Sequence, residues 1–165
     1  MAALSSADPV FYTPDNYRPD GSAAYTMRRI LAMMAAEVDE ALEPQGLTSA
    51  QWLPLLKLHM GQASTVAELA RCCQLDTGAM TRLLDRLEAK ALVARVRSSE
   101  DRRVVNIELT PEGLAAAKQI PAVLCKVQNA FLEGFTLEEW QLLKSLLQRI
   151  LENGLKLQGS PERKE

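Results

Sequence analysis

The spacing of apolar residues changes abruptly within this 165-residue chain, and this change constrains the fold more than any other feature. From Ser22 to about Lys90 the apolar residues recur every three or four positions, which is typical of amphipathic helices. Over Leu92 to Arg97 and Arg102 to Leu109 they alternate with polar residues, which predicts two strands. Two such strands are too few to fold alone. We therefore expect a mainly α fold with one small β-ribbon.

Two short helices are predicted directly before the ribbon. The capping-box pattern Thr65-Val-Ala-Glu68 begins the first, and Asp76 can cap a second that reaches about Lys90. About three residues join them, which makes the pair a helix-turn-helix candidate. The second helix leaves small and hydrogen-bonding residues outward near its N-terminus, where such helices contact base edges. The ribbon that follows, with its polar tip flanked by arginines, is then a wing.

Further helices are predicted on both sides of this central part. Before it, apolar spacing indicates helices from Ser22 to about Leu42 and from Thr48 to about His59. After it, Thr110-Pro111 begins a helix that extends to about Glu133. The last helix follows a capping box formed by Thr136 and Glu139, which Phe135 and Trp140 flank as a hydrophobic staple.

Charge is concentrated in the centre of the chain. The formal net charge is −2, but residues 71–103 hold eight basic and five acidic residues, a net of +3. The remaining 11 basic and 16 acidic residues give −5. A basic centre in an acidic chain indicates a localised anion-binding surface.

Several classes of protein are disfavoured by the sequence. No run approaches the ~18 apolar residues of a membrane span, and no secretory leader is recognisable, so we expect a cytoplasmic protein. Three cysteines do not form a disulfide framework. A single histidine and the lack of Cys-x-x-Cys or any catalytic motif predict no metal, no cofactor and no enzyme activity.

The most specific motifs lie in residues 76–93 and 98–113. The wing tip Asp101-Arg102-Arg103, followed by Leu109-Thr110 and Gly113, resembles the signature of the MarR family of bacterial transcriptional regulators. The resemblance covers roughly residues 24–152. Ala91 is a departure, because relatives often have glycine after the recognition helix. A winged helix-turn-helix fold with N- and C-terminal dimerisation helices is implied.

The resemblance places a DNA-binding site on the second helix and the wing. Small residues let the helix enter a major groove, while arginines can contact bases, phosphates or the minor groove. Asp101 is implied to orient the wing through Arg103, which leaves Arg102 free for DNA. The predicted DNA-binding residues are Thr65, Asp76, Thr77, Gly78, Ala79, Thr81, Arg82, Arg86, Arg97, Ser98, Ser99, Arg102 and Arg103.

The domain organisation follows from the same resemblance. We expect an irregular arm over 1–21, a dimerisation helix over 22–46, the DNA-binding domain over 47–110, dimerisation helices over 111–157 and a tail over 158–165. A homodimer is expected to bind double-stranded DNA at a pseudo-palindromic operator.

A small aromatic carboxylate or phenolic effector is expected to release the DNA. The predicted pocket draws on the first and second helices, and its candidate residues are Tyr25, Arg28, Arg29, Trp52, Leu56 and His59. Two alternatives remain open. One is a redox-responsive regulator that uses Cys72, Cys73 or Cys125, and the other is a winged-helix protein-interaction module without a ligand.

Overall fold

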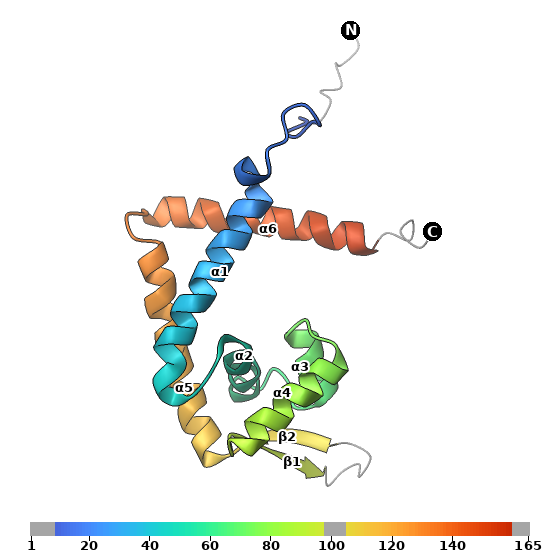
Figure 1. Ribbon diagram of the computed structural model, residues 1–165, viewed down its shortest axis with the longest axis vertical. Coiled ribbons are helices and arrows are strands. Elements are labelled where there is room, and N and C mark those ends of the chain that lie inside the picture. Colours follow the sequence, from blue (N-terminus) through green and yellow to red (C-terminus); the bar gives the residue numbers. More distant parts are fainter. Residues whose placement is uncertain (1–8, 98–104, 160–165) are drawn as a thin grey trace. The chain divides into compact units, whose positions relative to one another are not determined.

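The computed structural model describes residues 9–97 and 105–159 and is mainly helical, with one antiparallel two-stranded ribbon (Figure 1). This confirms the predicted fold class. The helices and strands, in order, are α1 (Ala23–Leu42), α2 (Ser49–His59), α3 (Val66–Cys72), α4 (Thr77–Ala89), β1 (Val93–Arg97), β2 (Val105–Leu109), α5 (Pro111–Phe131) and α6 (Leu137–Gly159). Two short 3-10 helices, η1 (Pro19–Gly21) and η2 (Glu43–Gln45), flank α1. The chain forms two compact units, which meet in sequence between Leu124 and Cys125.

The helices begin where the capping residues predict. Ser22 Oγ accepts a hydrogen bond from the Tyr25 amide at 3.2 Å, and the Thr48 amide donates to Gln51 Oε1 at 3.3 Å. Such bonds satisfy amides that have no partner within the helix. The predicted starts of α1 and α2 are therefore confirmed.

In the first unit α2, α3, α4 and the ribbon pack together (Figure 1). Their buried apolar side chains form one core. Each large apolar side chain in this core stabilises the fold by about 1.5–3 kcal/mol relative to leaving it exposed. The fully buried members include Leu55, Leu69, Met80, Leu84 and Leu87. Ile107 of β2 adds the wing to the same core, at 2% exposure.

A backbone contact fixes the corner where β2 leads into α5. Thr110 Oγ1 donates to the Ala91 carbonyl at 2.6 Å and accepts from the Gly113 amide at 3.0 Å. The Thr110 amide donates to the Leu92 carbonyl at 3.2 Å. A Cβ atom at position 113 would lie only 1.8 Å from the Leu92 oxygen, so the corner requires glycine.

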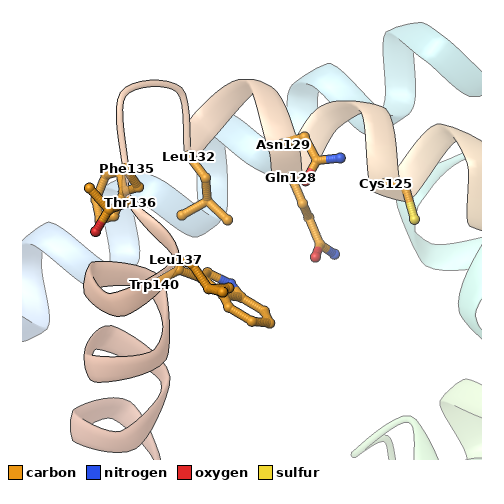
Figure 2. Close-up of a pocket in the computed structure, with 8 residues that line it drawn as sticks. All are labelled: Cys125, Gln128, Asn129, Leu132, Phe135, Thr136, Leu137 and Trp140. Carbon is orange, nitrogen blue, oxygen red and sulfur yellow. The ribbon is translucent and has the colours of Figure 1, made fainter.

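The second unit is a helix corner. α5 ends at Phe131, two residues before the predicted end, and the chain turns through Gly134, whose φ is +85°. The capping box of α6 is confirmed, because the Thr136 amide donates to Glu139 Oε2 at 2.8 Å and the Glu139 amide donates to Thr136 Oγ1 at 3.2 Å. Phe135 and Trp140, the predicted staple, line one hollow of about 400 Å³ (Figure 2).

The C-terminal end of α6 lies further along the chain than the sequence predicts. The helix continues through Gly159, although we expected a tail from Gln158. Glutamine is a good helix former, so one polar residue does not end a helix of this length.

Candidate nucleic-acid interface

Side-chain caps stabilise the N-terminal ends of both α3 and α4. Glu68 Oε2 accepts hydrogen bonds from the Thr65 amide at 3.0 Å and the Ser64 amide at 2.8 Å. Above all, the bond from the Ser64 backbone lowers the pKa of the Glu68 carboxyl group. At α4, Asp76 Oδ1 accepts from the Ala79 amide at 2.8 Å. The predicted helix-turn-helix is therefore present, and Thr65 and Asp76 both act in it as caps.

The exposed face of α4 carries five of the thirteen residues predicted to contact DNA. Thr77, Gly78, Thr81, Arg82 and Arg86 are exposed. The structure thus brings the small residues and both arginines of the helix to one solvent-facing surface.

Ala79 differs from the other small residues of α4. It is half-buried, and it lies next to the fully buried Met80. Its methyl group is therefore partly covered by the protein itself.

The Thr81 hydroxyl donates its hydrogen bond within α4. Its Oγ1 donates to the Thr77 carbonyl at 2.8 Å, one turn earlier in α4. In this rotamer Thr81 offers its methyl group and oxygen lone pairs to a partner but no donor.

The wing is anchored on both sides. β1 pairs with β2 in a register that places Val93 opposite Leu109 and Arg97 opposite Val105. The Ile107 amide of β2 also donates to the Ser64 carbonyl at 2.7 Å, directly before α3. A third segment therefore joins the ribbon to the start of the helix-turn-helix.

The ribbon places Arg97 at the exposed end of β1, towards the wing tip. The other predicted wing residues lie outside the described part of the chain, so their contacts stay predictions. These are Ser98, Ser99, Asp101, Arg102 and Arg103.

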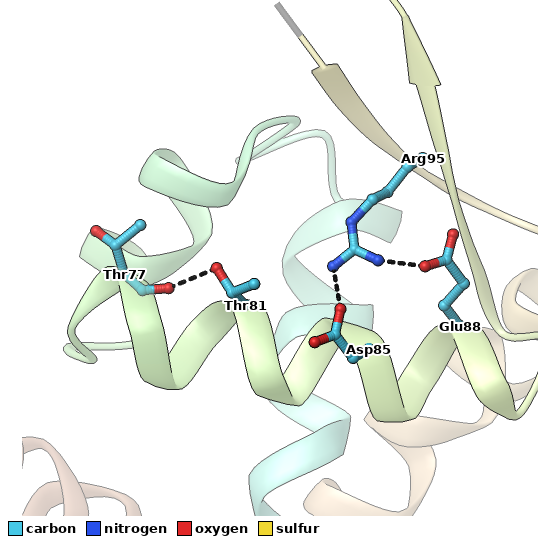
Figure 3. A network of polar contacts seen from close by, with 5 residues as sticks. All are labelled: Thr77, Thr81, Asp85, Glu88 and Arg95. Atoms are coloured by element: carbon cyan, nitrogen blue, oxygen red, sulfur yellow. Dashed lines mark hydrogen bonds and ion pairs between the residues drawn. The ribbon is translucent and has the colours of Figure 1, made fainter.

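Sequence reasoning missed an ion cluster that joins the wing to α4. Arg95 of β1 extends its guanidinium over α4, where Nη2 lies 2.6 Å from Asp85 Oδ1 and Nη1 bonds Glu88 Oε2 (Figure 3). The hydrogen bond to Asp85 and the two negative charges raise the pKa of Arg95. The only signal in the sequence is the spacing of Asp85 and Glu88, which places both on one helix face.

The predicted effector residues occupy several surroundings. The Arg28 and Arg29 guanidinium carbons lie 5.7 and 5.9 Å from the centre of the Tyr25 ring, on the first turns of α1. His59 lines a hollow of about 340 Å³ with Leu58, Ser64, Ile107 and Leu114, and none of the other five predicted residues takes part in it.

The other two effector candidates, Trp52 and Leu56, are half-buried on α2. The structure does not test the proposed pocket, so the set stays a prediction.

The cysteines occupy two different environments. Cys72 and Cys73 are half-buried at the end of α3, and burial raises the pKa of the Cys73 thiol. Cys125 is exposed on α5 and lines the hollow at the helix corner (Figure 2). Within residues 9–97 and 105–159, no group of three or more His, Cys, Asp or Glu side chains is placed to hold a metal ion.

Comparison with known proteins supports the class that the geometry defines. The helix-turn-helix with its attached ribbon makes this a winged-helix protein. The model of the MarR family matches residues 45–104. The crystal structure of the transcriptional regulator PA3341 is 34% identical, with a TM-score of 0.72, and the match covers 82% of this chain and 99% of that chain. This chain belongs to the MarR family.

Two further solved structures resemble the chain over a similar span. The reduced form of MarR from E. coli is 27% identical with a TM-score of 0.69, over 79% of this chain and 96% of that one. A mutant of E. coli MarR complexed with operator DNA is 28% identical with a TM-score of 0.71, over 78% and 92% of the two chains.

Among the described residues, no helix is both long and apolar enough to cross a membrane.

Proposed function

We propose that this chain is a sequence-specific DNA-binding transcriptional regulator that inserts α4 into a major groove. The observation that carries the proposal is the exposed face of α4, where residues with little bulk precede Arg82 and Arg86. A helix reads base edges only when its backbone can approach the groove closely. The related MarR mutant complexed with operator DNA supports this assignment.

The wing supplies contacts that hold the protein on the duplex. Arg97 lies at the exposed end of β1, and Arg102 and Arg103 follow in the sequence. Arginines at a wing tip bind phosphates or enter a narrow minor groove. Asp101 serves to orient this tip through Arg103, as the family resemblance implies.

A homodimer is the proposed binding unit. Apolar side chains are left uncovered on α1 and along α6, where Leu31 is 67%, Leu142 59% and Leu155 58% exposed. Surfaces of this kind mark sites of association. A two-fold dimer presents two copies of α4, so the proposed operator is a pseudo-palindrome with half-sites about one helical turn apart.

We further propose that the protein is a repressor released by an aromatic carboxylate or phenolic compound. Arg28 and Arg29, placed beside the Tyr25 ring, offer the charge and the aromatic surface that such a ligand needs. Benzoate- and hydroxycinnamate-type acids should lower the affinity of the unmodified protein for its operator. Equal affinity with and without them would contradict this part of the proposal.

DNA binding itself is tested by selection from a random-sequence duplex pool. The unmodified chain should enrich a pseudo-palindrome, and Arg82→Ala should relax the preference at one position by about 1–3 kcal/mol. Arg97→Ala should weaken binding to all duplexes. The slope of the logarithm of the binding constant against the logarithm of the salt concentration should become shallower by about one. Failure to enrich any sequence would favour a protein-interaction module instead.

A further inference from the structure

The cluster of Arg95, Asp85 and Glu88 lies on the same face of α4 as two residues proposed to read DNA. Thr77, Thr81, Asp85 and Glu88 follow one another along this face (Figure 3), at spacings of four, four and three residues. The side chains of Asp85 and Glu88 remain 57% and 41% exposed. Two carboxylates thus continue the line of the reading surface.

Without a partner, these carboxylates would oppose DNA binding. α4 itself carries Arg82 and Arg86 against Asp85 and Glu88, so the charges of the helix cancel. Phosphates repel carboxylates that approach them closely. A helix with no net positive charge is a poor element to place in a groove lined by phosphates.

Arg95 counters this repulsion from outside the helix. The Arg95 side chain is the least exposed of the three, at 28%, and its guanidinium pairs with each carboxylate through a separate nitrogen. A planar guanidinium suits this double pairing. Exposed ion pairs contribute little to stability, so stability alone is a weak reason to gather three charged residues here.

We propose that Arg95 is a positioning residue that masks the charges of Asp85 and Glu88, so that α4 can enter a groove lined with phosphates. This inference rests on the proposed DNA-binding function. Arg95 acts through the two carboxylates and need not touch DNA. The arginines therefore have two roles. Those on α4 face the duplex, and Arg95 on β1 pairs with the two carboxylates of α4 and so offsets their negative charge.

The test compares variants that remove either side of the cluster. Binding is measured by fluorescence anisotropy, at several salt concentrations, on the duplex enriched by the unmodified chain and on a random-sequence duplex. Arg95→Gln should weaken binding to both duplexes about tenfold near 0.1 M salt. The double variant Asp85→Asn/Glu88→Gln should bind as tightly as the unmodified chain or more tightly.

Two further variants separate charge from shape. Arg95→Lys keeps the positive charge but lacks the planar guanidinium that pairs with two carboxylates at once. It should recover most of the affinity that Arg95→Gln loses. The triple variant, which combines Arg95→Gln with both carboxylate changes, should return to within about threefold of the unmodified chain. Lys118→Gln, which removes an exposed positive charge from α5, is the matched control and should have no effect.

The outcomes are distinguishable. If Arg95→Gln and the double carboxylate variant weaken binding equally, the cluster only holds the wing against α4, and the masking proposal is wrong. Unchanged binding by Arg95→Gln, with its fold verified by circular dichroism, also overturns it. If the unmodified chain binds neither duplex, the proposed DNA-binding function falls, and the masking role falls with it.

Discussion

Replacing Gly113 with alanine should destabilise the winged domain, because the added methyl group has no space. The new Cβ would lie 1.8 Å from the Leu92 oxygen, whereas real Cβ atoms essentially never come closer than 3.0 Å. The backbone must therefore move by at least the difference of 1.2 Å. Leu92 also accepts the hydrogen bond of the Thr110 amide, so the displacement breaks the link between α4 and α5.

The magnitude follows from three contributions. Overpacking costs about 1–3 kcal/mol, and one lost hydrogen bond costs about 1 kcal/mol. Alanine in a helix recovers about 1 kcal/mol relative to glycine. The free energy of unfolding of Gly113→Ala should therefore fall by about 2 kcal/mol.

Urea unfolding followed by circular dichroism measures this loss. With a slope of about 2 kcal/mol per molar, the midpoint should fall by about 1 M. Protomer concentrations must be equal, because association stabilises the folded state. Gly154→Ala on α6 is the control, since nothing lies within 4 Å of its new Cβ, and it should be neutral or stabilising. A Gly113→Ala protein as stable as the unmodified chain would refute the reasoning.

Three further predictions follow from local geometry. Ala91 has a φ of +55°, so Ala91→Gly should raise the free energy of unfolding by about 0.5–1 kcal/mol. Ala89→Gly at the last residue of α4 should instead lower it, by at most about 1 kcal/mol. Equal effects in urea unfolding would contradict this. Hydrogen bonds lower the pKa of Glu68 from 4.5, so its contribution to stability is present above pH 4.5 and lost as pH falls through the lowered value. The stability gap between the unmodified chain and Glu68→Gln should thus narrow between pH 7 and pH 3, and a constant gap would disprove the assignment. Burial raises the pKa of Cys73, so iodoacetamide should modify it more slowly than N-acetylcysteine at pH 7.5, as followed by mass spectrometry.

The helix starts were predictable because their chemistry is local. The capping boxes that begin with Thr65 and Thr136 each need residues only three positions apart. The end of α5 was predicted less well, because the apolar pattern continues past the point where the chain turns through Gly134. The left-handed conformation of Ala91 agrees with its place where relatives often carry glycine.

Contacts across the wing were not predictable in this way. The bond from the Ile107 amide to the Ser64 carbonyl joins residues far apart in the chain and depends on the position of β2 against the start of α3. The half-burial of Ala79 was not predictable either. A small residue next to Met80 can lie either towards the core or away from it, and only the packing of the other elements decides which. Periodicity identifies the helix face but not the depth at which each residue lies on it.

Arg95 changes the interpretation of the charge pattern from which the anion-binding surface was predicted. Residues 71–103 carry +3, and Arg95 contributes to that sum as though it were available to DNA. The structure instead pairs it with Asp85 and Glu88, in a cluster whose charge is −1. The other charged residues of the segment therefore carry +4. The positive excess therefore lies on the other residues of the helix-turn-helix and the wing. Asp85 and Glu88, the two acidic residues of α4, are paired with Arg95.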